Sequence, residues 1–416
     1  MTIHSGPLVV DVISEPVALR RPGGRERRRD PWSLWRCLPG WGQALAVFAA
    51  SRVFFTFVAH RAAAMAAPHP DGRRWNYLEI ANNWDGTWYH RIVLEGYPSP
   101  LPVDAAGAVV TNTWAFYPLF PKLTGALMRV TGLDWTLTAT LVSLAAAGGA
   151  VVLLRSLLER VTGPRTAIWA VVLLSFFPSS LVLQLPYSES LALLLVVAVL
   201  MCLQRHRYVS VVPLLLLLGL SRPVGVPMAV VLTVHLGREV LAVRGMPKAV
   251  TIRSLAGPVM AWLASGLAAV EWPLLVWWGT GVPDGYTRTM AAWRTPREVV
   301  PLRPWIQMAQ NLLGEIVGPV ALVMLFGALA WWLARRGWSL VGADLTVWCG
   351  AYAAYLLAVL DSFTSLPRYL LPMFPLGALL VSTSRSRAFR VTLTIVFATV
   401  GVVWMLAIWR SRHWAP

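Results

Sequence analysis

Charged residues are scarce in this chain of 416 residues. Only 13% are Asp, Glu, Lys or Arg, and 36 basic residues outnumber 19 acidic ones. Hydrophobic residues make up 57% of the chain, and the mean hydropathy is +0.60. A soluble domain carries about 25% charged residues, so the composition excludes an ordinary water-soluble protein. It is typical of a chain with repeated membrane-spanning helices.

Cysteine is rare as well. Cys37, Cys202 and Cys349 are the only three, and their spacing matches neither a metal motif nor a disulfide framework. No group of histidine and carboxylate residues has the spacing of a metal-binding motif either. We therefore expect unpaired thiols, no bound metal and no cofactor.

The net charge of +17 would point to nucleic acid in a soluble protein. Here, however, Lys and Arg lie mostly in short connections between apolar runs, and no basic and aromatic RNA-binding motif is present. They indicate membrane topology and contacts with anionic lipids, so we expect no nucleic-acid partner. Residues 1–40 are rich in arginine and contain several Pro and Gly, which predicts a disordered basic tail on the cytoplasmic side.

The apolar runs predict an all-α polytopic domain over residues 41–409, with about ten or eleven transmembrane helices and a short tail at 410–416. The first external loop, 67–131, is expected to carry juxtamembrane helices, and 281–311 forms a second external loop. The apolar runs lie at about 41–66, 114–131, 134–157, 164–183, 187–204, 208–237, 257–280, 312–334, 342–360, 366–383 and 389–409.

The short segment 114–131 decides the topology. If it spans the membrane, five later clusters of arginine fall outside in succession, against the positive-inside rule. If it only lies at the membrane surface or re-enters, all five fall inside. We therefore interpret it as non-spanning. Segment 208–237, broken at Ser221–Gly225, then becomes a hairpin of two short helices with Arg222 at its outer apex.

The first external loop contains the sequence Trp-Asp-Gly-Thr-Trp-Tyr-His-Arg-Ile, residues 84–92. Ile80, Trp84, Trp88 and Ile92 recur every four residues, which predicts one short helix with an apolar, aromatic face. Asp85 falls on another face and would be held at the membrane surface. A plainer alternative is an interfacial helix whose Asp merely faces water, since Trp and Tyr gather at bilayer boundaries.

With this topology, polar side chains from several segments gather on the outer side, where ionisable groups near hydrocarbon are usually functional. A carboxylate can accept a proton from a hydroxyl nucleophile, and arginines can bind a phosphate and stabilise its charge as it leaves. The set therefore suits transfer of a sugar from a lipid-linked phosphate to a hydroxyl. Its members are Trp84, Asp85, Trp88, Tyr89, His90, Tyr187, Glu189, Arg222, Asp361, Arg368 and Tyr369.

Two of these residues have simpler interpretations. Glu189 follows Pro-Tyr-Ser at a predicted helix start, where an acid complements the helix dipole. Asp361 can serve as a partner that orients Arg368 rather than as a catalytic group.

Several of these segments resemble the PIG-V type mannosyltransferases, which belong to the GT-C superfamily. The resemblance is carried by Trp84–Tyr89, Glu95–Pro98 and Ala115–Pro121, and then by Phe177–Ser179, Pro186–Ser190, Ser221–Gly225 and Pro367–Tyr369. It covers about residues 41–385. The Ala-, Val-, Arg- and Trp-rich composition resembles that of actinobacterial members.

The resemblance implies a multi-spanning GT-C transferase with an essential acid in the first external loop, here Asp85. The donor would be a polyprenyl-phosphate mannose, inverted to an α-mannoside at the extracytoplasmic face of the plasma membrane. The acceptor would be a glycolipid, a lipoglycan or a protein.

We assign Asp85 as general base, Arg222 and Arg368 to the donor phosphate, and the other residues of the set to the sugar or acceptor.

The rival interpretation is a secondary transporter or lipid flippase, which predicts inverted repeats and ionisable residues near the bilayer midplane. Most apolar runs have centres without acidic residues, and Glu271 and Glu315 are the exceptions.

Overall fold

The computed structural model describes residues 35, 37–65, 71, 72, 74–294, 298–360 and 365–411, without the side chains of 249 and 409–411. The chain divides into two units, 1–38 and 39–416, and the architecture below is that of the second. Most of the predicted basic tail lies outside the described residues. The described residues form helices connected by turns, with one isolated β-bridge between Val103 and Val109. The all-α prediction is confirmed.

The helices follow the predicted apolar runs closely. In chain order they are α2 (Gly40–Met65), α3 (Tyr77–Ala81), α4 (Asp85–Glu95), η1 (Thr113–Ala115), α5 (Leu119–Thr131), α6 (Trp135–Thr162), α7 (Pro164–Ser175), η2 (Ser180–Gln184), α8 (Glu189–Gln204), α9 (Tyr208–Gly219), α10 (Gly225–Ala242), α11 (Lys248–Thr280), α12 (Gly285–Ala292), α13 (Arg303–Leu313), α14 (Val317–Trp332), η3 (Leu333–Gly337), α15 (Trp338–Leu340), α16 (Ala343–Val359), α17 (Leu366–Tyr369), η4 (Leu371–Met373), α18 (Pro375–Ser382) and α19 (Arg387–Ser411).

Six helical segments of the described chain are long and apolar enough to cross a membrane: 40–65, 135–162, 225–242, 250–280, 317–340 and 387–408. Four shorter apolar helices, α7, α8, α9 and α16, accompany them. Helix α5 has 13 residues, which at 1.5 Å per residue is about 20 Å and falls short of a hydrocarbon core of about 30 Å. The number of spans and the topology stay predictions.

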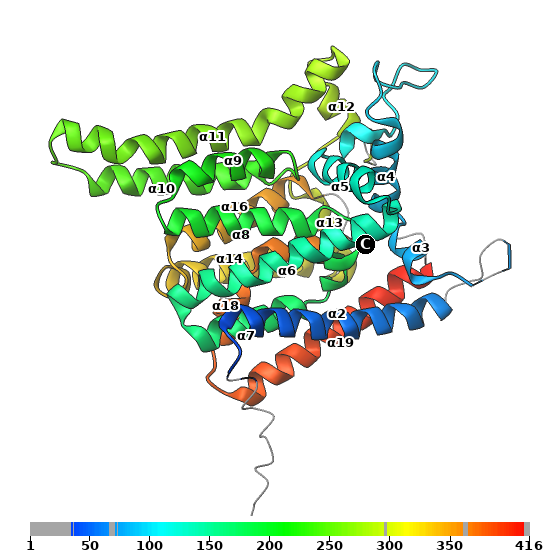
Figure 1. Cartoon of the computed structure of the whole chain (residues 1–416). Helices are drawn as coiled ribbons and strands as arrows, with labels where there is room; N and C mark the ends of the chain where they lie inside the picture. Colours follow the sequence, from blue (N-terminus) through cyan, green and yellow to red (C-terminus); the bar gives the residue numbers. More distant parts are fainter. Residues whose placement is uncertain are drawn as a thin grey trace, which may run out of the picture. The chain divides into compact units, whose positions relative to one another are not determined.

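The long helices run side by side, with α3, α4, α5 and α12 gathered at one end of them, on the right of Figure 1. Helix α6 packs against α2, α7 and α8, and α11 packs against α9 and α10. Small residues allow some of these approaches. A Cβ at Gly149 of α6, for example, would lie 3.2 Å from a methyl carbon of Leu194 on α8.

Proline and glycine account for the interruptions. The predicted run 366–383 is divided into α17, η4 and α18, because Pro367, Pro372 and Pro375 lack the N–H that a continuous helix needs. The predicted break in 208–237 is present, since α9 ends at Gly219 and α10 begins at Gly225. A Cβ at Gly225 would lie 2.9 Å from the Cα of Ala269, so only glycine lets α10 lie this close to α11.

Candidate active site

The predicted single helix around Asp85 is wrong in one respect, because the segment breaks into α3 and α4. Asn82 caps the end of α3, and Trp84 precedes α4 with φ of +57°, a conformation that is uncommon for residues other than glycine. The side-chain oxygen of Asn82 accepts a hydrogen bond of 2.6 Å from the indole of Trp135, which fixes the break. Asp85 is therefore the first residue of α4, where the helix dipole favours a negative charge.

The second part of the site comes from the start of α8. The 3-10 helix η2 leads into Pro186, and Tyr187 and Ser188 follow, both fully buried. The Tyr187 hydroxyl donates to the backbone oxygen of Asn83 at 3.2 Å, which ties this turn to the break before α4. Glu189 begins α8 and is only 6% exposed. It is therefore more than a surface acid that complements the helix dipole.

Two arginines complete the site from two further segments. Arg222 lies in the turn between α9 and α10, and Arg368 lies in α17. Nη1 of Arg368 donates to Oδ2 of Asp85 at 2.6 Å and lies 3.4 Å from Oε1 of Glu189. Nη1 of Arg222 lies 2.6 Å from the same Glu189 oxygen. The four residues form an alternating chain, Asp85–Arg368–Glu189–Arg222, which we call the ion network.

The ion network is largely withdrawn from solvent. The side chains of Arg368 and Glu189 are 6% and 5% exposed, and those of Asp85 and Arg222 are 18% and 17% exposed. Burial lowers the pKa of each arginine, but the carboxylates raise it by more, chiefly Asp85 for Arg368 and Glu189 for Arg222. Both pKa values lie above their usual range, so both guanidinium groups stay charged.

Aromatic side chains surround the ion network. The guanidinium carbon of Arg368 lies 5.6 Å from the ring centre of Tyr187 and 5.1 Å from that of Tyr369. The guanidinium carbon of Arg222 lies 5.5 Å from the Tyr369 ring. These are cation–π distances, so the rings hold the two arginines in place without neutralising them.

A hydroxyl pair extends the ion network toward α4. The hydroxyl oxygens of Tyr89 and Ser188 lie 2.7 Å apart, and Arg222 donates to Ser188 at 3.3 Å. Burial raises the pKa of Tyr89, so its hydroxyl keeps its proton. Ser188 thus connects an aromatic residue of the first loop to an arginine, a role that the sequence did not single out.

Glu189 has one unused acceptor oxygen. Its Oε1 lies 2.6 Å from Nη1 of Arg222 and 3.4 Å from Nη1 of Arg368, whereas its buried Oε2 has no hydrogen-bond partner among the described residues. Buried polar atoms of this kind are rare in folded proteins. Oε2 can therefore accept a hydrogen bond from a hydroxyl group of a bound molecule.

The remaining predicted residues lie in three places. Trp88 stacks on Phe116 with ring centres 5.7 Å apart and meets the edge of Trp293 at 4.9 Å. Trp84 is partly buried against the core. The structure does not bring His90 into the ion network, because its ring stacks on Trp135 at 5.2 Å. Asp361 lies outside the described residues.

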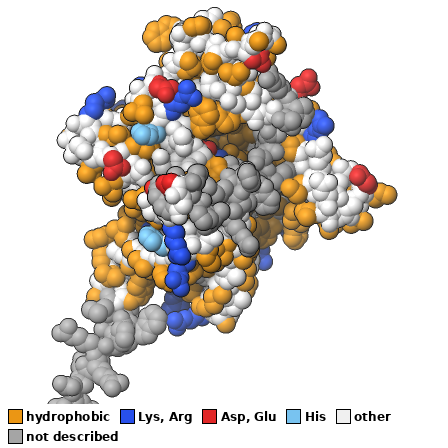
Figure 2. Space-filling model, turned by 90° about the vertical axis from the view of Figure 1, so that its right-hand side faces the viewer, with side chains coloured by type: hydrophobic (Ala, Val, Ile, Leu, Met, Phe, Trp, Pro, Cys, Tyr) orange, Lys and Arg blue, Asp and Glu red, His pale blue; other side chains and the backbone are white. Residues whose placement is uncertain are grey.

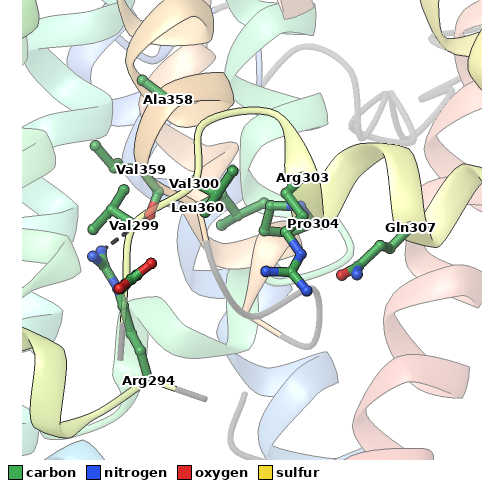
Figure 3. Close-up of a pocket in the computed structure, with 10 residues that line it drawn as sticks. Arg294, Val299, Val300, Arg303, Pro304, Gln307, Ala358, Val359 and Leu360 are labelled. Atoms are coloured by element: carbon green, nitrogen blue, oxygen red, sulfur yellow. Dashed lines mark hydrogen bonds between the residues drawn. The ribbon is translucent and has the colours of Figure 1, made fainter. Parts of the chain in front are cut away.

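A pocket of about 130 Å³ lies between residues of the second external loop and the end of α16. Arg294 and Glu298 line it together with Arg303 and Gln307 of α13. Figure 3 shows Arg294 on one side, bonded to the backbone oxygen of Val359 at 3.3 Å, with Arg303 and Gln307 on the other. Arg294 directly follows Trp293, whose ring contacts Trp88 of α4. The second external loop therefore approaches the aromatic residues of α4.

Sequence reasoning missed the residue that fixes η2. Arg52 of α2 is buried and donates to the backbone oxygens of Ser175 and Ser180, at 2.9 and 2.5 Å. It also donates to the side-chain oxygen of Gln184 at 3.3 Å. A lone arginine within an apolar run was the available signal, because such a charge needs partners at membrane depth.

The end of the molecule that carries α4 and α5 faces the viewer in Figure 2. Hydrophobic side chains are widespread there, and charged side chains occur singly or in small groups among them. Such a mixture is typical of a surface at the boundary between hydrocarbon and water.

Comparisons with known proteins add a likeness of fold. No protein-family model and no curated protein sequence matches the chain. Among solved structures it is similar to the Archaeoglobus fulgidus oligosaccharyltransferase tethered with an acceptor peptide containing the NVT sequon, with 12% identity and a TM-score of 0.46. The apo form matches with 11% and 0.44, and the archaeal enzyme with an inhibitory peptide and a dolichol-phosphate with 11% and 0.43.

These matches cover 88%, 88% and 89% of this chain, but 55%, 56% and 55% of the other chains. The chain thus spans little more than half the length of the structures it resembles. A likeness with a TM-score below 0.5 does not carry an activity from one protein to another. The ion network is therefore the observation from which function is inferred.

Proposed function

We propose that this chain is a membrane-bound glycosyltransferase, which moves one sugar from a lipid-linked phosphate donor to a hydroxyl group of an acceptor. The buried ion network carries this proposal. It places two permanently charged guanidinium groups beside two carboxylates, at the meeting point of four segments. Phosphate binding and proton transfer need these two kinds of group.

The two arginines suit the donor phosphate. A guanidinium group binds phosphate oxygens with two parallel hydrogen bonds. As the bond between the sugar carbon and the phosphate oxygen breaks, its electron pair stays on the phosphate, and Arg222 and Arg368 stabilise that charge. In this scheme the arginines provide the positive charge that a metal ion supplies in other transferases.

Asp85 suits the acceptor. Its Oδ2 accepts a hydrogen bond from Arg368 in the free protein, and a donor phosphate that binds Arg368 takes over this hydrogen bond. Asp85 is then free to remove the proton from the acceptor hydroxyl as its oxygen attacks the sugar carbon. Donor binding therefore prepares the base, and Asp85 ends the step protonated.

Glu189 and the aromatic residues suit the sugar itself. Oε2 of Glu189 has no hydrogen-bond partner among the described residues, so it can accept a hydrogen bond from a sugar hydroxyl. Tyr89, Tyr187 and Tyr369 lie beside the ion network, in contact with Ser188 or Arg368. Trp84 and Trp88 would contact the sugar or the acceptor. His90, stacked on Trp135, has no part in this scheme.

The resemblance to the PIG-V type enzymes suggests the donor sugar, the product and the acceptor. It makes the donor a polyprenyl-phosphate mannose, the product an α-mannoside formed by inversion, and the acceptor a glycolipid, lipoglycan or protein. The site would lie at the extracytoplasmic face of the plasma membrane. Apart from the lipid-linked donor, which is a substrate, the reaction would need no cofactor.

The test is sugar transfer in membranes that contain the full chain. Radiolabelled polyprenyl-phosphate mannose is supplied to the wild type, to Asp85→Asn and to Asp284→Asn. Asp284 is the matched control, because it also pairs with an arginine, Arg288, but both side chains are more than half exposed. We expect label in the lipid or protein fraction with the wild type and the control. Loss of the base should slow transfer at least about 100-fold.

Two outcomes would contradict the proposal at different levels. Transfer by Asp85→Asn at the wild-type rate would remove Asp85 as the base. If the wild type transfers no label from mannose or any other lipid-linked hexose, the transferase assignment itself is wrong.

One observation favours the rival function, transport or lipid flipping. Glu271 lies within the apolar helix α11, and its buried Oε1 has no hydrogen-bond partner among described residues. Glu315, the second exception among the apolar runs, lies before α14 and accepts a hydrogen bond from Gln310 at 2.7 Å. Transport predicts movement of labelled lipid across proteoliposomes that Glu271→Gln abolishes and Asp85→Asn leaves intact. The transferase proposal predicts no such movement.

A further inference from the structure

Three side chains with metal-binding atoms meet far from the ion network. They are His206, in the turn between α8 and α9, and His235 and Glu239, one turn apart on α10. One atom from each lies within 4.8 Å of the others. Nδ1 of His206 and Nε2 of His235 lie 3.7 and 3.8 Å from Oε1 of Glu239. Sequence spacing concealed this group, because 29 residues separate the histidines.

A hydrogen bond of His235 turns its other ring nitrogen, Nε2, toward this group. Its Nδ1 lies 3.2 and 3.1 Å from the two carboxylate oxygens of Asp344 on α16. An ionised carboxylate can only accept, so Nδ1 carries a proton, and in the neutral ring Nε2 has the lone pair that a metal ligand needs. A histidine whose second nitrogen donates to a carboxylate is the usual arrangement behind a metal ligand. Arg238 lies 3.4 Å from Asp344, which holds that carboxylate in place.

The hydroxyl group of Tyr208 shows that both ring nitrogens face one point. Its oxygen lies 2.9 Å from Nδ1 of His206 and 3.0 Å from Nε2 of His235. His206 has φ of +51°, in the left-handed region that residues other than glycine seldom adopt. Backbone strain of this kind is commonest at functional sites. Here it accompanies a ring turned toward α10.

We propose that His206, His235 and Glu239 bind a divalent transition-metal ion such as Zn²⁺, with the Tyr208 oxygen at the fourth position. Zinc takes nitrogen and carboxylate ligands at about 2.0–2.2 Å in a tetrahedron, which places ligand atoms about 3.4 Å apart. The separations of 3.7 and 3.8 Å to Glu239 need a small closure, and the Tyr208 oxygen, at 2.9 and 3.0 Å from the two ring nitrogens, needs a small outward shift. The His206 side chain is 63% exposed and Glu239 is 27% exposed, so the ion can enter from solvent.

The bound metal would join three elements. It would tie the turn after α8 to α10, and Asp344 extends the connection to α16. His235 lies ten residues after Gly225, the start of α10, which is about 15 Å at 1.5 Å per residue. The site is therefore separate from the ion network and has a structural role. It does not depend on the proposed sugar transfer.

The alternative without metal is a hydrogen-bonded chain of histidine, tyrosine and histidine, with Glu239 paired to whichever ring is protonated. This arrangement also explains the short contacts to Tyr208. It differs from the metal site in one respect, because it predicts no specific uptake of zinc and no stabilisation by it.

The test uses the full-length protein, purified in detergent without a histidine tag, stripped with EDTA and dialysed against ZnCl₂. Zinc per chain is measured by mass spectrometry, and the thermal unfolding midpoint is recorded with and without zinc. The variants are His206→Ala, Glu239→Gln and Asp344→Asn. The control is His60→Ala, since His60 is an exposed histidine of α2.

We expect one zinc per wild-type chain and per His60→Ala chain, with a raised midpoint. His206→Ala and Glu239→Gln should bind zinc at least tenfold more weakly, and Asp344→Asn 10- to 100-fold more weakly because it orients His235. Midpoints measured without zinc show whether each variant is folded. Equal zinc uptake by folded wild type, His206→Ala and Glu239→Gln would overturn the proposal, and so would a wild type that binds none.

Discussion

Nη1 of Arg368 donates to Oδ2 of Asp85 at 2.6 Å, although 283 residues separate them in the chain. Both side chains are mostly buried, and Glu189 and Arg222 continue the same alternation of charge. In the proposed reaction the arginine holds the phosphate and the carboxylate removes a proton. Their contact therefore couples the donor to the acceptor. A donor phosphate that binds Arg368 frees Asp85 to bind the acceptor hydroxyl.

This contact leads to a prediction about stability. Arg368→Gln leaves Asp85 and part of the charge of Glu189 without compensation, and breaking a buried ion pair from one side destabilises by about 3–5 kcal/mol. Adding Asp85→Asn removes the unpaired charge and should restore part of the loss. The free energy of unfolding is measured by denaturant titration in detergent.

The control for this prediction is Arg288→Gln. Its pair with Asp284 is 2.8 Å long but more than half exposed, and such surface pairs contribute about 0–1 kcal/mol. If Arg368→Gln destabilises no more than Arg288→Gln, the ion network is not held together by its charges. If the double variant is no more stable than Arg368→Gln, the two residues are not coupled.

Periodicity and turn residues allowed the helices to be predicted, because apolar runs and Pro or Gly breaks act locally. The break at Ser221–Gly225 is an example, since α9 ends at Gly219 and α10 begins at Gly225. The helix prediction was wrong where a distant contact interrupts a local pattern. Ile80, Trp84, Trp88 and Ile92 suggest one helix, but the bond from Trp135 to Asn82 holds a break between them.

The gathering of the four charged side chains was predictable for a different reason. Asp85 lies in the first external loop, Glu189 and Arg368 lie near the starts of apolar runs, and Arg222 lies at a break within one; such residues need partners near a membrane. Their pairing was not predictable, because it depends on the packing of four segments. The same limit hid His206, His235 and Glu239, which share no motif and meet only in the fold.

Arg52 provides a second prediction. Arg52→Leu removes the donors to the backbone oxygens of Ser175 and Ser180, and hydrogen bonds from charged groups contribute about 1.5–3 kcal/mol each. Unfolding should become easier by at least about 3 kcal/mol. Transfer should also fall, because η2 leads directly to Glu189.

Arg61→Leu is the matched control for Arg52, since Arg61 lies on the same helix and is exposed. It should change stability by less than about 0.5 kcal/mol. Equal unfolding free energies for Arg52→Leu and the wild type would show that η2 is held by other contacts.

His90 provides a prediction about pH. Burial against Trp135 lowers its pKa below the usual value of about 6.5. Below that pH the unfolded chain binds a proton that the folded chain resists, so the contribution of His90 is complete above about pH 6.5 and is lost as pH falls through the folded pKa. Between pH 7.5 and 5, the thermal midpoint of the wild type should fall more than that of His90→Gln. Equal falls would mean that His90 titrates alike in both states.

The approach of α9 to α11 gives the last prediction. A Cβ at Gly219 would overlap the carbonyl oxygen of Ala268 and lie 2.8 Å from its Cα. Gly219→Ala should therefore push the helices apart and destabilise by about 1–3 kcal/mol. Gly237→Ala on α10 meets no atom within 4 Å and should stabilise by up to about 1 kcal/mol, because alanine favours helix.

The two alanine variants also separate packing from chemistry. Gly219 lies three residues before Arg222, so a displaced α9 should move that guanidinium away from Glu189, now 2.6 Å distant. Transfer by Gly219→Ala should then fall with a higher KM for the donor, because Arg222 is assigned to its phosphate. Gly237→Ala should keep wild-type kinetics. A Gly219→Ala protein with unchanged stability and unchanged KM would show that the α9–α11 contact does not position Arg222.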